Sequence, residues 1–301
     1  MSSSNASVFR GAWTALVTPM RDGAIDVPAL QGLVEQQIAG GIDGLVPCGT
    51  TGESPVLSPT EHVSVVRTVV DAVRGRVPVL AGAGSNCTRE AVELAAECKA
   101  LGVAGTLQIT PYYNKPEQDG LIGHFQAIAS AVDLPIIVYN VPGRTGCDIV
   151  APTLARLAAS TPAVVGVKEA TASMARAAEI REQCGPDFAI LSGDDFTVLP
   201  LMSLGGDGVI SVISNLAPAL MSGLCAAAAA DRWAEARALH YQLLPLCRTL
   251  FRAANPIPAK AAMAMLGMCT AEIRLPLQPL PADSPILAEL RRELETLELL
   301  K

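Results

Sequence analysis

The sequence predicts an α/β fold, a (β/α)8 barrel with a C-terminal helical appendage. Eight short apolar runs recur along the chain at intervals of 19 to 33 residues. Segments of helical length, several of them amphipathic, separate most of these runs, and a chain of 301 residues is long enough for one such barrel plus an appendage. The runs begin near Trp13, Gly44, Val77, Gly105, Pro135, Val164, Ala189 and Gly208.

The alternation of apolar strands with helices favours parallel pairing, because helices then cover both faces of the sheet. Eight such units close into a barrel of the TIM type. An open, doubly wound sheet is the alternative fold. That fold usually has a glycine fingerprint after its first strand. Here Thr18-Pro19-Met20 follows the first run, and Gly82 and Gly84 lack a third glycine at position 87.

Helix signals lie between the strands. Ser58-Pro59-Thr60-Glu61 forms a capping box ahead of valines at helical spacing, so we expect a helix to begin there. After the eighth run, the pattern is helical only, most clearly over 233–251 and 286–299. We therefore expect residues 1–225 to form the barrel with the functional site, and residues 226–301 to form a C-terminal helical region.

Composition excludes several classes of protein. The 22 basic and 29 acidic residues give a net charge of −7, and no Lys/Arg run is present, so nucleic acid is not an expected partner. Residues 1–8 lack the basic and apolar regions of a secretory signal. The charge-free stretch 208–230 is interrupted by Asn215, Pro218 and Gly223, so no membrane span is expected. These features predict a cytoplasmic protein.

No metal or cofactor is expected. The eight cysteines include no C-x-x-C pair, which makes reduced thiols the expectation. The three histidines, His62, His124 and His240, belong to no cluster with metal-ligand spacing.

Lys168 stands out among the five lysines because it ends the apolar run 163–167. Burial at the end of a strand disfavours the charged amine and makes a neutral, nucleophilic amine available for Schiff-base chemistry. The alternative is a structural ion pair with the neighbouring Glu169, since buried charges are usually paired. Lys99, Lys115 and Lys260 lie in helical or turn segments that do not indicate such a role.

The segments that follow the strands hold polar residues suited to proton transfer and carboxylate binding. In a barrel these segments meet at one rim, so we expect them to surround Lys168. Arg144 lies in a Pro-Gly-Arg-Thr-Gly turn, where a guanidinium suits a carboxylate ligand, and a loop salt bridge is the alternative. Two of these features also have a structural explanation. Tyr139 could be a tyrosine at the edge of the core with a satisfied hydroxyl, and the Gly-Thr-Thr-Gly segment could be a turn of small residues.

Together these segments resemble the dihydrodipicolinate synthase family, within the pyruvate-dependent class I aldolase and N-acetylneuraminate lyase superfamily. The resemblance extends from Gly11 to the Asn255-Pro256-Ile257-Pro258 turn and beyond. The motifs that carry it are Gly49-Thr50-Thr51-Gly52-Glu53, Pro111-Tyr112-Tyr113, Tyr139-Asn140-Val141-Pro142-x-Arg144-Thr145-Gly146 and Gly166-x-Lys168-Glu169-Ala170.

The resemblance implies a lyase in which Lys168 forms an imine with pyruvate. The enamine then attacks aspartate 4-semialdehyde to give 4-hydroxy-tetrahydrodipicolinate, the entry to diaminopimelate and lysine biosynthesis. It implies a proton relay of Thr50, Tyr139 and Tyr113, with Tyr113 supplied by a neighbouring subunit of a homotetramer, a dimer of dimers. Arg144 would bind the carboxylate of aspartate 4-semialdehyde. Further substrate contacts would come from Thr51, Gly193 and Ile210.

Some members of the family bind lysine as a feedback inhibitor at a dimer cleft. Pro55 and Pro59 stand where inhibited members often have Ala and His, so the match to that site is partial. Two other functions stay open at this point: a sugar-acid aldolase acting on N-acetylneuraminate or 2-keto-3-deoxygluconate, and a non-catalytic small-molecule sensor. The positions that match the lysine site are Ser54, His62, Asn86, Glu90 and Tyr112.

Overall fold

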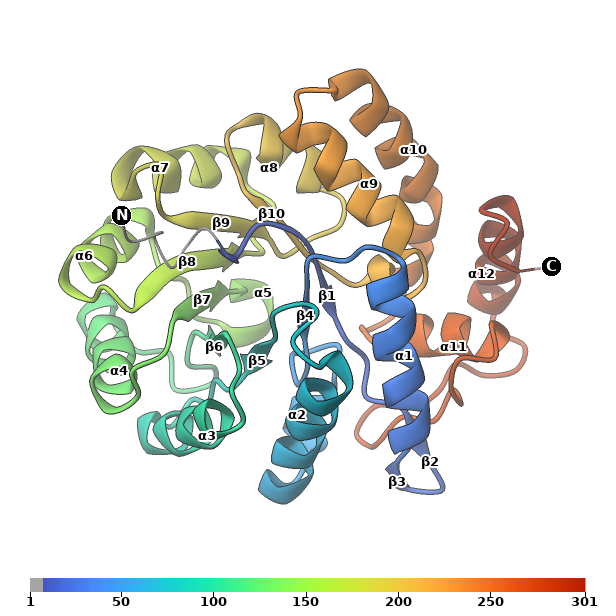
Figure 1. Ribbon diagram of the computed structural model, residues 1–301, viewed down its shortest axis with the longest axis horizontal. Coiled ribbons are helices and arrows are strands. Elements are labelled where there is room, and N and C mark those ends of the chain that lie inside the picture. The colour runs from blue at the N-terminus through green and yellow to red at the C-terminus, as the bar shows by residue number, and fades with distance from the viewer. Residues whose placement is uncertain (1–7, 301) are drawn as a thin grey trace.

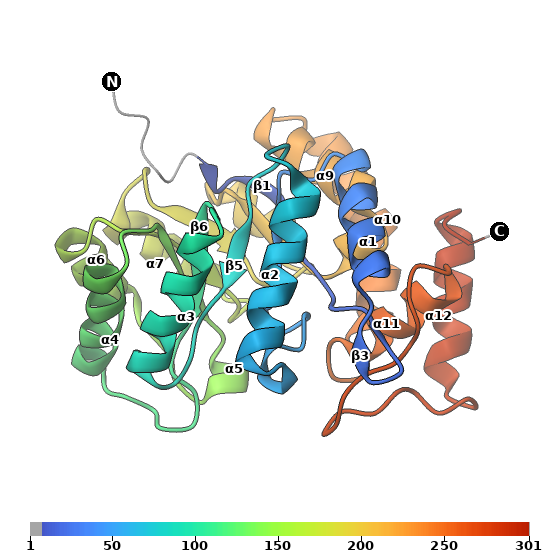
Figure 2. The ribbon, with the colours of Figure 1, turned by 60° about the horizontal axis from the view of Figure 1, so that its bottom comes forward.

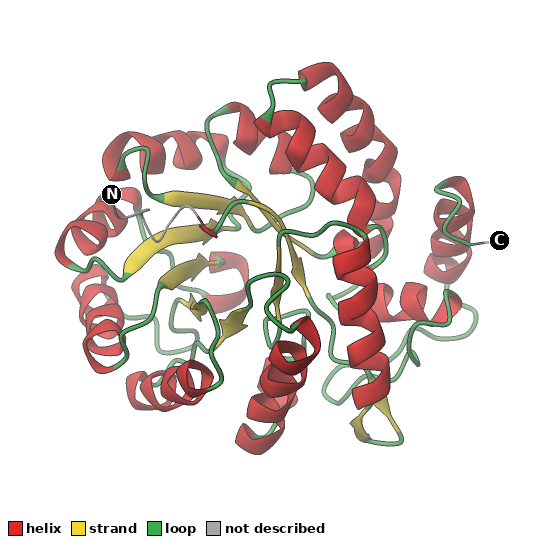
Figure 3. Cartoon of the chain, viewed as in Figure 1, coloured by secondary structure: helices red, strands yellow, loops and turns green. Residues whose placement is uncertain are grey.

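A ring of eight parallel strands forms the centre of the protein in the computed structural model, which describes residues 8–300 (Figures 1 and 3). The hydrogen-bonded order is β4-β1-β10-β9-β8-β7-β6-β5. The amide of Leu45 donates to Pro78 and the amide of Gly82 to Pro47, at 3.1 and 2.9 Å, which brings the two ends of the sheet together. The strands are β1 (Gly11–Ala15), β4 (Gly44–Val46), β5 (Leu80–Gly82), β6 (Gly105–Ile109), β7 (Ile136–Asn140), β8 (Val164–Glu169), β9 (Ala189–Ser192) and β10 (Gly208–Ser211).

The predicted (β/α)8 barrel is therefore confirmed, with one shifted boundary. The third apolar run begins at Val77, but the strand begins at Leu80, after a single bridge between Val79 and Leu45. Pro78 has no amide hydrogen to donate to the ladder, which delays regular pairing.

Helices surround the sheet on its outer face (Figure 1). A two-stranded hairpin, β2 (Met20–Arg21) with β3 (Ala24–Ile25), precedes the first of them. The helices of the barrel are α1 (Val27–Ala39), α2 (Pro59–Val73), α3 (Thr88–Ala100), α4 (Gln118–Ala131), α5 (Pro142–Thr145), α6 (Ala151–Ser160), α7 (Met174–Cys184), α8 (Val198–Ser203) and α9 (Pro218–Ala229), with short 3-10 turns η2 (Ser54–Val56) and η3 (Ile213–Asn215).

Two hydrophobic cores lie on the two faces of the sheet. One fills the barrel interior with a buried side chain from every strand, among them Trp13, Ile137 and Ile210. The other lies between the strands and the helices and includes Val138 and Val167. Because both faces of each strand are covered, the strands read as continuous apolar runs, as the sequence predicted.

The C-terminal helices extend the barrel on one side (Figure 2). They are α10 (Trp233–Leu250), α11 (Ile257–Met265) and α12 (Pro285–Thr296). Two of them match the predicted segments 233–251 and 286–299. Helix α9 runs across residue 225, so a division between barrel and appendage at 225/226 falls inside a helix that packs against β1 and α10.

No helix of the described residues is long and apolar enough to cross a membrane. The stretch 208–230 forms β10, η3 and α9. The segment 1–8, considered above as a signal region, lies almost entirely outside the described residues.

The start of α2 has the predicted capping box. The Ser58 side chain accepts from the amide of Glu61 at 3.3 Å, and the Glu61 carboxylate accepts from the amide of Ser58 at 2.9 Å. Loss of a serine N-cap costs about 1 kcal/mol. Ser58→Ala should therefore lower the free energy of unfolding by about 1 kcal/mol, measured by urea denaturation. Ser64→Ala, at an exposed position inside the same helix, is the matched control and should leave stability nearly unchanged.

Candidate active site

Lys168 and Tyr139 form the centre of the candidate site. They are Cα partners on β8 and β7, and both are 6% exposed. The Lys168 amine lies 4.2 Å from the centroid of the Tyr139 ring. A cation held over an aromatic face at this distance is attracted by the ring. The pair thus places an amine and a phenol side by side in the barrel.

A register shift in β8 directs Lys168 into the barrel. Ile136 pairs with Val164 but Ile137 pairs with Gly166, so one extra residue, Val165, is inserted. Val165 belongs to the interior core; strict alternation from it would direct Lys168 outward. The β-bulge changes the alternation by one residue, so Val167 packs outside and Lys168 points inside.

Glu169 does not pair with Lys168, which was the structural alternative. Its carboxylate accepts from the amide of Thr171 at 2.7 Å and from the Asn140 side chain at 3.1 Å. Within residues 8–300, Lys168 makes no ion pair. Among the described residues, the amine is therefore buried beside the Tyr139 ring without a neutralising carboxylate.

Lys260 corrects the prediction that Lys168 alone occupies an unusual position. The Lys260 side chain is fully buried, forms an ion pair with Glu53 and donates to the carbonyl of Glu272 at 2.8 Å. It is thus the structural, paired lysine. Its surrounding sequence, Ile257–Met265, is apolar on all sides of the helix, which is the signal that could have indicated its burial.

The loop after β4 is held from the C-terminal region. Glu53 adopts a left-handed backbone conformation, with φ of 56°, and its carboxylate contacts Lys260 and the amide of Arg274. Thr51 is buried, and its hydroxyl accepts from the Asn255 side-chain amide at 2.9 Å. The residues that fix this loop therefore lie about 200 residues further along the chain, and Asn255 and Lys260 were not among the predicted site residues.

Arg144 lies on α5, a single turn directly after β7. The turn ends at Gly146, whose φ of 67° favours glycine. Arg144 is exposed and makes no ion pair within the described part of the chain, so the alternative of a loop salt bridge is not realised there. Its guanidinium is available for a ligand.

A cavity of about 430 Å³ brings Arg144 together with Thr50. The buried Lys168 and Tyr139 side chains do not line it. The cavity is lined by Thr50, Ser54, Pro55, His62, Gly84, Leu94, Ile109, Tyr112, Arg144 and Thr145.

Gly193 and Ile210 are placed next to the pair from β9 and β10. A Cβ atom on Gly193 would lie 2.6 Å from the Cβ of Ala170 and 3.2 Å from Cε of Lys168, so any other residue here would clash with Ala170 and crowd the lysine. Ile210 is buried in the interior core with Tyr139.

Tyr113, a predicted member of the proton relay, lies at the surface of this chain. Its side chain is 89% exposed, whereas Lys168 and Tyr139 are buried. Its backbone has φ of 71°, and its amide donates to Thr145 at 3.3 Å. The strained backbone presents the phenol to the outside of the protomer.

The sequence matches the model of the Dihydrodipicolinate synthetase family over residues 8–296. The chain belongs to this family. It is 58% identical to the 4-hydroxy-tetrahydrodipicolinate synthase of Oleidesulfovibrio alaskensis over 272 residues, which cover 90% of this chain and 93% of that protein.

Two solved structures of the family are similar over nearly the whole chain. The chloride-inhibited dihydrodipicolinate synthase from Acinetobacter baumannii, complexed with pyruvate, has a TM-score of 0.94 and 43% identity, covering 97% of this chain and 99% of that chain. The enzyme from Cyanidioschyzon merolae with lysine bound has a TM-score of 0.93 and 42% identity, with the same coverage.

The positions that match the family's lysine site divide into two groups. Ser54, His62 and Tyr112 line the same cavity as Thr50 and Arg144. Asn86 and Glu90 do not line it: Asn86 donates to the carbonyl of Tyr112, one of the lining residues, at 3.2 Å, and Glu90 accepts from the Ser85 hydroxyl at 2.8 Å.

A histidine that only faces solvent on its helix was the structural alternative for His62, and the structure does not support it. His62 is 6% exposed, and its Nε2–H donates to the carbonyl of Gly82 at 2.7 Å. Burial lowers the pKa of His62, although the bond to Gly82 opposes this change.

The Lys260–Glu53 pair gives a stability prediction. Lys260→Met leaves the Glu53 carboxylate buried without its cation, which should lower the free energy of unfolding by about 3 to 5 kcal/mol. Urea denaturation measures the change. Lys99→Met, on the exposed surface of α3, is the control and should be nearly neutral. A Lys260→Met protein as stable as the parent would contradict the structural role.

Proposed function

We propose that Lys168 is the residue through which this chain carries out the reaction of its family. The chain condenses pyruvate with aspartate 4-semialdehyde to give 4-hydroxy-tetrahydrodipicolinate, the first committed step of diaminopimelate and lysine biosynthesis. The observation that carries the assignment is the buried Lys168 amine beside Tyr139, in contrast to the buried lysine that is paired, Lys260.

In this mechanism the Lys168 amine attacks the ketone carbon of pyruvate and water leaves, which gives an imine. Loss of a methyl proton converts the imine into an enamine, whose carbon attacks the aldehyde of the second substrate. The amino group of the second substrate then adds to the former ketone carbon, and the bond from that carbon to the Lys168 nitrogen breaks, which closes the ring and releases the lysine. The Tyr139 phenol, next to the amine, is placed to exchange protons in these steps.

Thr50 and Tyr113 complete the proposed proton relay. Thr50 lines the cavity that leads toward solvent, and Tyr113 projects away from its own protomer. We propose that Tyr113 enters the site of a neighbouring subunit in a homotetramer built as a dimer of dimers. The exposure of this tyrosine supports such a contact, because burying the apolar ring against another subunit would be favourable.

The other proposed substrate contacts come from residues at or just beyond the ends of the strands. Thr51 would hold the pyruvate carboxylate, with Asn255 fixing its hydroxyl. Gly193 and Ile210 would shape the space around the imine. Arg144 would bind the carboxylate of aspartate semialdehyde, since its guanidinium shares the cavity with Thr50 and is free of carboxylate partners among residues 8–300. This residue favours the semialdehyde over an uncharged sugar chain.

We further propose that lysine binds near Ser54, His62, Asn86, Glu90 and Tyr112, and that the reaction takes place in the cytoplasm. The relative with lysine bound supports the first proposal. Ser54, His62 and Tyr112 share the cavity of Thr50 and Arg144, so a ligand there would lie close to the substrate entrance.

Reduction with borohydride in the presence of pyruvate tests the imine. We expect a reduced pyruvyl adduct on Lys168 and none on Lys260, measured by peptide mass spectrometry. Lys168→Arg should abolish both the adduct and turnover, because a guanidinium is not nucleophilic. An adduct on another lysine would refute the mechanism.

Arg144→Ala tests the second carboxylate site. Loss of charge-assisted hydrogen bonds should lower kcat/KM for aspartate semialdehyde about 10- to 100-fold, whereas imine formation with pyruvate should persist. Steady-state kinetics and borohydride trapping measure the two effects. The matched control is Arg67→Ala, an exposed arginine on α2, which should leave both unchanged. Unchanged turnover of Arg144→Ala would overturn its role.

A further inference from the structure

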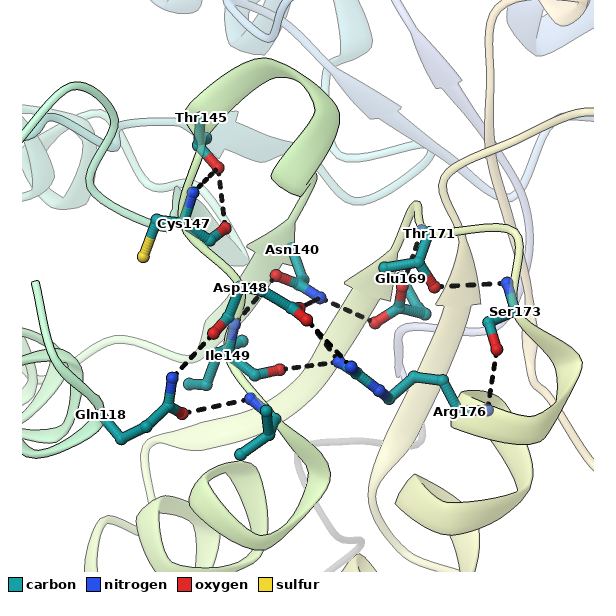
Figure 4. A network of polar contacts seen from close by, with 11 residues as sticks. Gln118, Asn140, Thr145, Cys147, Asp148, Ile149, Glu169, Thr171, Ser173 and Arg176 are labelled. Carbon is teal, nitrogen blue, oxygen red and sulfur yellow. Dashed lines mark hydrogen bonds and ion pairs between the residues drawn. The ribbon is translucent and has the colours of Figure 1, made fainter. Parts of the chain in front are cut away.

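A network of polar side chains joins the ends of β7 and β8 to the segment after α5 and to α7 (Figure 4). Asn140 and Glu169 are the last residues of β7 and β8, and they are Cα partners. Each directly follows a residue of the Lys168–Tyr139 pair, so its side chain points to the opposite face. The two side chains meet there.

Asn140 uses all of its hydrogen-bonding groups in this network. Its side-chain nitrogen donates to Glu169 at 3.1 Å and to Asp148 at 2.9 Å, and its oxygen accepts from the amide of Ile149 at 3.2 Å. The second oxygen of Glu169 accepts from the amide of Thr171 at 2.7 Å. Asn140 is fully buried, so each of these bonds is shielded from competing water.

Arg176, on α7, anchors the network to the helix layer. It donates to both carboxylate oxygens of Asp148, at 3.0 and 2.9 Å, and to the carbonyl of Ile149 at 3.1 Å. Burial of Asp148 acts to raise its pKa, but the bonds from Arg176 and Asn140 outweigh this effect and lower it. The bidentate geometry fixes the position of Asp148 and thereby that of Asn140.

The location of this network matters because regular pairing between β7 and β8 ends at Asn140 and Glu169. The Lys168–Tyr139 pair lies one residue before that end, and beyond it a single backbone bond, from the amide of Ala170 to the carbonyl of Asn140 at 3.0 Å, still joins the two segments. Small displacements of reacting groups cause large losses of rate.

We propose that Asn140 and Glu169 are positioning residues, whose hydrogen bond across the ends of β7 and β8 holds the Tyr139 phenol against the Lys168 amine. This inference rests on the proposed roles of Lys168 and Tyr139. Neither Asn140 nor Glu169 faces the substrate side of the sheet, so both act through the pair.

Exchange of the pyruvate methyl protons with deuterium, followed by NMR, tests the proposal. This exchange requires imine and enamine formation and no second substrate. Glu169→Gln removes the negative charge of the carboxylate that accepts from Asn140. Asn140→Asp sets a new carboxylate against those of Glu169 and Asp148. Each variant should lower the exchange rate about 10- to 100-fold, with little change in KM for pyruvate.

In the double variant Asn140→Asp/Glu169→Gln, the hydrogen bond can form again in the opposite direction. The amide at position 169 then donates to the carboxylate at position 140. The double variant should recover part of the lost rate, because the contact between positions 140 and 169 forms again while the bond from position 140 to Asp148 stays lost. Such coupling is expected only of residues in direct contact. Additive losses, or single variants as fast as the parent, would overturn the proposal. Asp119→Asn, which breaks the exposed ion pair with Arg156 between α4 and α6, is the control and should be unchanged.

Failure of the proposed function and failure of a variant to fold can each be distinguished from failure of the positioning role. If the parent enzyme itself shows no exchange and no borohydride adduct, the proposed function fails first. If Asn140→Asp does not fold, Arg176→Lys serves instead, since it keeps the charge but loses the bidentate contact to Asp148. Slower exchange at an unchanged melting temperature supports the positioning role, and an unchanged rate refutes it.

Discussion

The parallel pairing of β7 with β8 is the interaction on which the site depends. It sets Tyr139 opposite Lys168, and the bulge at Val165 directs the Lys168 side chain into the barrel interior, where Tyr139 already lies. Closure of the sheet then covers both of its faces with apolar residues, so polar groups collect at the ends of the strands. A change of one residue in this register would turn the lysine toward the helices.

The rim around the pair is supported from outside the barrel interior. The C-terminal region holds the loop after β4 through the Lys260–Glu53 pair and the bond from Asn255 to Thr51. On the other side, the network of Asn140 and Glu169 joins two strand ends to α7 (Figure 4). Buried polar groups are stable only with partners, so each contact constrains the loop that supplies it.

The two buried lysines illustrate the difference between stability and chemistry. Lys260 has a carboxylate and a carbonyl as partners, whereas Lys168 has an aromatic face and a glycine, Gly193, that leaves it space. Buried charged groups are usually paired, so among the described residues Lys168 departs from the pattern that Lys260 follows. Burial alone, which singled out Lys168 in the sequence, does not separate the two.

The sequence by itself determined the eight strands, the capping box at Ser58 and the helices α10 and α12, because local periodicity and capping chemistry produce them. It also assembled the rim motifs, since strand ends meet in any such barrel. Only the tertiary structure decided the direction of Lys168 and the pairing of Lys260 with Glu53. A bulge interrupts the two-residue alternation that sequence patterns reveal, and an ion pair between distant segments forms only when the fold brings them together.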